Sequence, residues 1–231
     1  MLKYCKKCIL PNTRPNIQFN DQGVCDGCES SSQKQKSIDW SLREKMFSQL
    51  AKETKRKKCN YDCVIPVSGG KDSTWQVIKA LEYNLNPLCV TWKTPARNSL
   101  GAANLDNLIN LGVNHIDFSI NPIVEKKFTL KAFERNGIPL TPMHMAMYAI
   151  SLQVALYFKI PLIIWGENAA FEYGGGDSIA RGFQLSRSYL RKFGITNGTT
   201  SKDWISNDLS EKDLAPYDWP SDKNLLSAGI K

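Results

Sequence analysis

From residue 61 onward, short apolar runs alternate with longer stretches of helical periodicity. The runs are rich in Val, Ile, Leu and aromatic residues, and we predict strands at 62–67, 87–92, 115–120 and 161–165. Helices are expected at 72–84, 101–111, 122–136, 143–158 and about 178–193. This alternation is typical of βαβ units, so the predicted fold class is α/β, with a Rossmann-like parallel sheet covered by helices.

The first quarter of the chain has a different pattern. Residues 1–30 show little apolar periodicity, whereas Leu42, Met46 and Leu50 follow the i, i+4, i+8 spacing of a helix. We therefore divide the chain into a small module at 1–38, a helical linker at 39–58 and an α/β domain at 59–231.

Composition excludes two classes of protein. Of the 231 residues, 42% are hydrophobic and 23% charged, which is ordinary for a globular chain and excludes extensive disorder. No apolar run approaches the ~20 residues of a membrane span. The N-terminus has no stretch like a signal peptide, so a cytoplasmic location is expected.

The net charge of +8 is concentrated at the start of the chain. Residues 1–58 hold 13 Lys and Arg against 6 Asp and Glu, while the remainder holds 17 against 16. The basic linker could be an electrostatic footprint for nucleic acid or simply a solvated helix. It lacks the interleaved aromatic residues of a nucleic-acid surface, which favours the solvated helix and no nucleic-acid partner.

Four cysteines form two closely spaced pairs, Cys5-x2-Cys8 and Cys25-x2-Cys28. Each pair can direct two sulfurs at one ion, so this spacing predicts a zinc-ribbon-like module with four cysteine ligands, with an iron–sulfur cluster as the alternative. Cys63 and Cys89 instead lie inside predicted strands, where cysteine usually acts as a small hydrophobic residue.

The most informative string is Ser68-Gly69-Gly70-Lys71-Asp72-Ser73, which joins a predicted strand to a helix. Two glycines permit a tight turn, and the helix N-terminus adds partial positive charge, so the segment is suited to an anion such as phosphate. Its spacing differs from the Gly-x4-Gly-Lys-Ser/Thr loop of kinases.

This string resembles the PP-loop of the N-type ATP pyrophosphatases, whose fold is of the adenine nucleotide alpha hydrolase type. The resemblance implies that residues 59–231 bind ATP and cleave it to AMP and pyrophosphate. The ATP-binding residues that it implies, with two topological neighbours, are Ser68, Gly69, Gly70, Asp72, Ser73, Thr91 and Gly166. Lys71 and Asp72 are expected to be catalytic.

A second loop follows the fourth predicted strand and opens at the same sheet edge. Glu167 or Glu172 could bind Mg²⁺, a cation that prefers oxygen ligands. Asn168 could orient a substrate amide, and we expect catalytic roles for Glu167 and Asn168. Glu172, Tyr173 and Gly174 are expected to bind substrate. His144 could do so too, or it could be a structural histidine.

The cysteine pairs, the PP-loop string and the string Trp165-Gly166-Glu167-Asn168 together resemble the N-acetyl sugar amidotransferases of lipopolysaccharide O-antigen and nonulosonic acid biosynthesis. The resemblance implies that an acetamido group becomes an acetamidino group, with ATP, Mg²⁺ and Zn²⁺ as cofactors. It also implies two partners, a glutaminase subunit and a cyclase-like subunit that channels ammonia.

The alternative is a tRNA-modifying, thiolating enzyme with the same fold, consistent with the zinc module and the basic linker. Members of the amidotransferase family extend beyond a point equivalent to Lys231, so we expect the α/β domain to be truncated at its C-terminus.

Overall fold

The computed structural model describes residues 1–14, 17–37, 39–166, 196 and 198–230. The described residues form two compact units. One unit contains Met1–Lys45, and the other contains Met46–Gly166 together with the described residues from 196 onward. The second unit carries the sheet.

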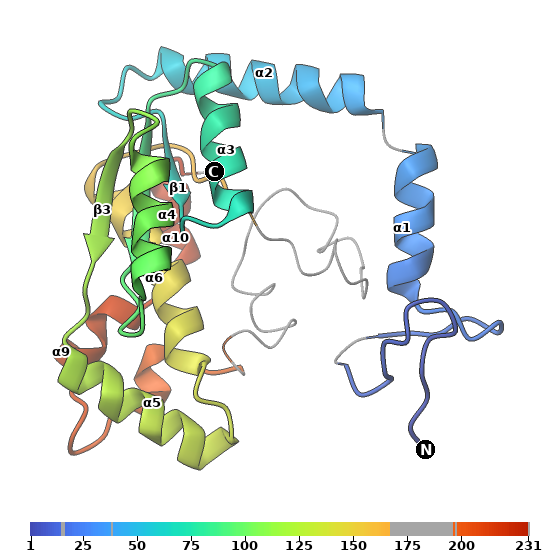
Figure 1. Ribbon diagram of the computed structural model, residues 1–231. Coiled ribbons are helices and arrows are strands. Elements are labelled where there is room, and N and C mark those ends of the chain that lie inside the picture. The colour runs from blue at the N-terminus through green and yellow to red at the C-terminus, as the bar shows by residue number, and fades with distance from the viewer. Residues whose placement is uncertain (15–16, 38, 167–195, 197, 231) are drawn as a thin grey trace. The chain divides into compact units, whose positions relative to one another are not determined.

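Three parallel strands form the sheet, in the order β1-β2-β3. They are β1 (Cys63–Pro66), β2 (Pro87–Trp92) and β3 (Asn114–Phe118). Helices α3 (Lys71–Glu82) and α4 (Ser99–Ile109) connect them in turn (Figure 1). The chain therefore has the predicted α/β fold with a parallel sheet, and the predicted bounds of β2 are confirmed.

The predicted fourth strand at 161–165 is reduced to a single parallel bridge between Ile163 and Val64 of β1. Two backbone hydrogen bonds make this bridge: Val64 donates to the Leu162 carbonyl and Ile164 donates to the Val64 carbonyl, each at 2.9 Å. The next donor along β1 would be Pro66, which has no N–H. The ladder therefore ends after one bridge, and the expectation of a full strand was wrong.

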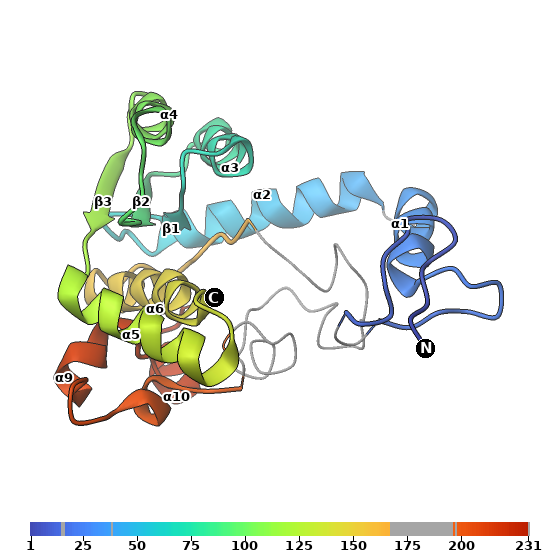
Figure 2. The same cartoon turned by 60° about the horizontal axis from the view of Figure 1, so that its bottom comes forward.

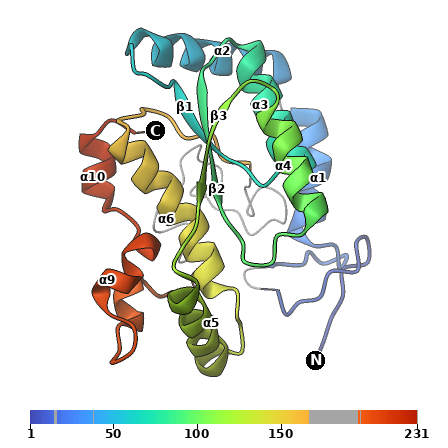
Figure 3. The same cartoon turned by 60° about the vertical axis from the view of Figure 1, so that its left-hand side comes forward.

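Alternate residues of the strands face two separate hydrophobic clusters. Val64, Leu88 and Val90 pack with α5 (Pro122–Asn136) and α6 (Thr141–Tyr157). Ile65 and Cys89 pack on the other face with α3 and α4. Figures 2 and 3 show these two helix pairs on opposite sides of the sheet. Burial on both faces explains why the strands are almost continuously apolar.

Helix α2 (Trp40–Arg56) matches the predicted linker helix, but α1 (Asp26–Ser37) was not predicted. Its sequence is mostly Ser, Gln, Lys and acidic residues, so it has no apolar stripe for a periodicity argument to detect. It begins directly after Cys25, and Cys28 lies in its first turn.

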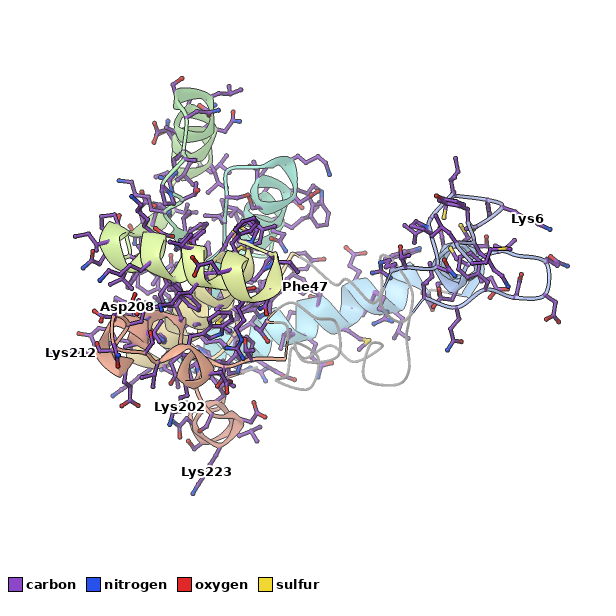
Figure 4. All side chains as sticks on the ribbon, turned by 90° about the horizontal axis from the view of Figure 1, so that it is seen from below. Lys6, Phe47, Lys202, Asp208, Lys212 and Lys223 are labelled. Atoms are coloured by element: carbon purple, nitrogen blue, oxygen red, sulfur yellow. The ribbon has the colours of Figure 1, made fainter. Side chains whose placement is uncertain are left out.

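The segment from residue 198 onward contains four short helical elements that the sequence analysis did not predict. They are η1 (Ser201–Trp204), α9 (Glu211–Leu214), η2 (Ala215–Tyr217) and α10 (Asp222–Ser227). Its buried Trp204, Leu214 and Tyr217 join the cluster on the α5–α6 face. The lysines labelled in Figure 4, Lys202, Lys212 and Lys223, lie at its exposed surface.

Candidate functional site

The connections of the sheet place the candidate site at the carboxyl ends of the strands. Strand β1 has β2 as its neighbour on one edge and Ile163 on its other edge. The connection from β1 to β2 passes through α3, on one face of the sheet, whereas the chain reaches Ile163 through α5 and α6, on the opposite face. A change of face beside one strand is a topological switch point, where open α/β sheets bind ligands. The segments that leave this point are 67–70, after β1, and 165–166, after the bridge.

Side-chain hydroxyls brace the loop between β1 and α3. The buried Ser73 hydroxyl donates to the Gly70 carbonyl at 3.1 Å and accepts from the Ser68 N–H at 3.3 Å. The Thr74 hydroxyl donates to the same carbonyl at 2.9 Å, and the Ser68 hydroxyl accepts from the Gly70 N–H at 3.4 Å. The first turn of α3 thus holds the loop in one conformation before any ligand arrives.

Gly69 is required by this conformation for two reasons. Its φ angle of +79° lies in the left-handed region, which favours glycine. A Cβ at this position would lie 2.7 Å from the backbone nitrogen of Leu105 and 2.9 Å from its Cα, both in α4. The loop can therefore approach α4 this closely only without a side chain.

The N-terminus of α3 is open to an anion. Gly70 is the N-cap residue, and no side chain of the described residues caps the helix. The nearest charged groups, Lys71 and Asp72, form an exposed ion pair at 2.6 Å, with side-chain exposures of 89% and 77%. Uncapped N–H groups, the helix dipole and an exposed lysine are together suited to bind phosphate oxygens.

Gly166 reaches this helix from the other segment. A Cβ on Gly166 would lie 2.9 Å from Oε1 of Gln76, so the Gln76 amide packs against the glycine backbone. The structure therefore brings Gly166 beside α3, as predicted for two segments that meet at one edge. The other predicted residues of the second loop, Glu167, Asn168, Glu172, Tyr173 and Gly174, lie outside the described residues, so their roles stay predictions.

Thr91 lies next to the loop, but its hydroxyl is already engaged. It donates to the Val67 carbonyl at 2.7 Å and contacts Nε2 of His115 at 2.9 Å. The residue is buried, with 7% of its surface exposed. These contacts explain how the side chain supports the loop, while direct binding of the nucleotide by Thr91 stays a prediction.

His115 was missed as a neighbour of the site. It lies opposite Cys89 in the ladder, and its ring reaches Thr91 of β2. The pKa of His115 is lowered, mainly by burial; Arg97 adds to the lowering, and Asp117 opposes it. The alternation of β3 offered a signal, because His115 and Asp117 are two residues apart and share a face.

Arg97 and Asp117 tie the segment after β2 to β3. The guanidinium donates two hydrogen bonds of 2.7 Å to the two carboxylate oxygens. This bidentate contact lowers the pKa of Asp117. The Arg97 guanidinium is thus engaged within the protein.

His144 lies half-buried in the first turn of α6. Its expected role in substrate binding stays a prediction.

The four N-terminal cysteines gather as predicted. Their sulfurs all lie within 4.8 Å of one another, with Cys5–Cys28 at 4.0 Å and Cys8–Cys25 at 3.5 Å. A tetrahedral zinc site with Zn–S distances of about 2.3 Å needs sulfurs about 3.8 Å apart. Backbone N–H groups of Lys7 and Cys25 also donate to the Cys5 sulfur at 3.3 and 3.2 Å, as expected for a thiolate ligand. The cluster could thus form a zinc-binding module.

The strand cysteines differ sharply from this cluster. Cys63 and Cys89 are fully buried in the sheet, and burial raises the pKa of Cys89 to about 12. Burial also raises the pKa of Cys63. Both thiols are therefore protonated at neutral pH and act as core residues, in agreement with the sequence interpretation.

Comparisons with known proteins give structural similarities only. No family model and no curated protein sequence matches the chain. A predicted subunit of tRNA methyltransferase from Methanocaldococcus jannaschii is 17% identical, with a TM-score of 0.37, covering 66% of this chain and 71% of that one. NMN synthetase from Francisella tularensis is 15% identical, with a TM-score of 0.42, and the match covers 80% of this chain and 92% of that one. At this level of similarity neither structure supports a function for this chain.

Among the described residues, no helix is long and apolar enough to cross a membrane.

Proposed function

We propose that the chain is an ATP-dependent enzyme that binds the nucleotide at residues 68–73 and cleaves it to AMP and pyrophosphate. The observation that carries this proposal is the uncapped N-terminus of α3, preceded by a glycine turn that Ser73 braces from within. A preorganised set of N–H groups stabilises negative charge as it develops on the departing pyrophosphate, without reorganisation. Lys71 would contribute positive charge beside the phosphates, because its side chain is exposed next to the N-terminus of α3.

The proposed reaction activates an amide. The carbonyl oxygen of the substrate attacks the α-phosphorus of ATP, the bond to the bridging oxygen breaks, and pyrophosphate leaves. The product is an O-adenylyl imidate. Ammonia then forms a bond to the imidate carbon, and AMP departs with the former carbonyl oxygen, leaving an amidine and releasing a proton. Mg²⁺ would screen the phosphate charges during the first step.

We further propose that the amide is the acetamido group of an N-acetyl sugar. The support for this step is the sequence resemblance described above. By the same resemblance, a glutaminase subunit and a cyclase-like channelling subunit would supply the ammonia. The proposed setting is lipopolysaccharide O-antigen or nonulosonic acid biosynthesis in the cytoplasm.

The thiolating alternative needs a reactive cysteine near the loop. Thiolate chemistry requires an accessible thiol with a low pKa. In the described part of the sheet domain, Cys63 and Cys89 are buried with raised pKa values. Cys59 precedes β1 and so lies toward the amino ends of the strands, away from residues 68–73. This distribution favours nitrogen over sulfur transfer.

The test is product analysis with ATP, Mg²⁺, an acetamido sugar and ammonium. We expect AMP and pyrophosphate, and a sugar whose mass falls by the difference between O and NH. Asp72→Ala should lower turnover about a hundredfold, the scale of one lost preorganised contact. Glu82→Ala is the matched control, because Glu82 also forms an exposed ion pair on α3, with Lys79. ADP and orthophosphate as products would refute the adenylation chemistry, and sulfur incorporated into tRNA would favour the alternative.

A further inference from the structure

The backbone pairing between the β1 segment and β2 ends at Val67. The last backbone bond of this pair runs from the Val67 N–H to the Val90 carbonyl at 2.9 Å. The register that pairs Pro66 with Val90 would next pair Val67 with Thr91. At that position the Val67 carbonyl accepts the Thr91 hydroxyl at 2.7 Å. A side chain thus holds the last carbonyl before Ser68.

The proton positions in this chain of contacts follow from the donors available. A threonine hydroxyl has one proton, and at 2.7 Å Thr91 gives it to the Val67 carbonyl. The 2.9 Å contact with His115 must then be donated by the ring, so Nε2 carries a proton. The polar chain therefore runs from His115 through Thr91 to Val67, each group donating to the next.

We propose that Thr91 and His115 are positioning residues for the phosphate loop, acting through the Val67 carbonyl and not through contact with the ligand. The role rests on the proposed binding of ATP at residues 68–73. Thr91 fixes the start of the loop from β2, as Ser73 fixes its end from α3. Between these two anchors lies Gly69, which packs against α4 with no space for adjustment.

Both members of the pair are held in place. Thr91 is buried, and β-branching restricts its side-chain rotamers. On the same face of β3, Asp117 is paired with Arg97, and these are the charged groups that act on His115. Burial also lowers the pKa of His115, which keeps the ring neutral at pH 7. A neutral ring can take either tautomer, so the protonated Nε2 is a specific consequence of the contact with Thr91.

The first experiment compares Thr91→Val with Thr91→Ser. Valine retains the shape but removes the hydroxyl, whereas serine retains the hydroxyl. Binding of Mg²⁺–ATP and of inorganic pyrophosphate would be measured by calorimetry. We expect about tenfold weaker binding of both by Thr91→Val, the scale of one buried hydrogen bond, and recovery in Thr91→Ser. Thr54→Val is the control, because Thr54 is also buried but lies in α2.

The outcomes separate three cases. If Thr91→Val melts at a lower temperature but binds pyrophosphate like the wild type, Thr91 is merely structural and the proposal is wrong. If wild-type protein binds neither ATP nor pyrophosphate, the proposed function fails and the positioning role fails with it. If Thr91→Val loses binding at a temperature where it is fully folded, and Thr54→Val does not, the role is supported.

The second experiment tests the polar chain without any ligand. Ring nitrogen chemical shifts of His115, read by NMR in a chain with two histidines, should report the Nε2–H tautomer. In Thr91→Val the acceptor is lost, and we expect the tautomer ratio to shift toward Nδ1–H. An Nδ1–H tautomer in the wild type would overturn the proposed arrangement. His115→Leu should weaken pyrophosphate binding, and His115→Gln, whose amide can donate, should restore part of it.

Discussion

Substitution of Gly69 by alanine tests the loop geometry most directly, because it adds one methyl group at the tightest contact of the loop. Two effects should combine. The first is the strain of a non-glycine residue at a φ of +79°. The second is the overlap of the new Cβ with the backbone of Leu105, whose nitrogen and Cα would lie 2.7 and 2.9 Å away. Because both atoms belong to a helix backbone, either the loop or α4 must move.

Other glycines of the chain separate the two effects. Gly137 has a φ of +68° and Gly112 a φ of +93°, but a Cβ on either would meet nothing within 4 Å. Alanine at these positions should cost about 1–2 kcal/mol, the strain of left-handed backbone alone. At Gly69 the overlap should add about 1–3 kcal/mol, the usual range for inserting a methyl group into a packed site. The expected total is about 2–5 kcal/mol.

Urea unfolding followed by circular dichroism would give the free energy of unfolding of each variant. The dependence of that free energy on urea concentration should match the wild type, which shows that the variants unfold in the same transition. Gly69→Ala should also weaken pyrophosphate binding, since the loop cannot keep its path, while Gly137→Ala should not. Equal losses of stability for Gly69→Ala and Gly137→Ala would refute the claim that the loop packs against α4. If Gly69→Ala is destabilised but binds pyrophosphate normally, the packing of the loop against α4 contributes to stability and not to binding.

Three further predictions follow from the cysteine cluster, His115 and Ser73. Purified protein should contain about one zinc per chain by elemental analysis, lost in Cys25→Ser but not in Cys59→Ser; stoichiometric iron would indicate a cluster instead. Because the pKa of His115 is lowered on folding, its contribution to stability is complete above its ordinary value of 6.5 and is lost as pH falls below that value. Unfolding between pH 7 and pH 5 should thus depend less on pH in His115→Gln, and an unchanged dependence would contradict the lowered pKa. Ser73→Ala should reduce AMP formation about a hundredfold by releasing the loop, and Ser73→Thr should retain part of it; wild-type rates for the alanine variant would contradict the bracing role.

The sequence was sufficient to predict the three strands of the sheet and its main helices, because each of them has an apolar pattern. The strands are buried on both faces and read as apolar runs. It failed where structure depends on local polar contacts. Two of the short helical elements after residue 198, η1 and α9, begin at capping boxes, Thr200 with Asp203 and Ser210 with Asp213. Ser, Thr and Asp side chains start these helices through local hydrogen bonds, which leave no apolar periodicity to detect.

The limits of sequence analysis at the candidate site have a similar cause. Gly69 is visible in the sequence because only glycine can adopt its conformation and approach α4 so closely. The cysteine cluster is visible because its spacing is local. The contact between Thr91 and His115 joins residues 24 positions apart, and it depends on the register of β2 against β3. A shift of β3 by one residue would turn His115 to the other face of the sheet, away from Thr91.

The chain contains two kinds of buried cysteine, and their surroundings in the fold explain the difference. Cys63 and Cys89 occupy positions that point into the cluster beneath α3 and α4, where burial keeps their thiols protonated. Cys5 and Cys25 are just as buried, but turns in the small module bring backbone N–H groups to the Cys5 sulfur. Burial alone therefore does not decide the chemistry of a thiol. The donors that the backbone supplies distinguish a candidate metal ligand from a core residue, and they are set by the fold of each unit.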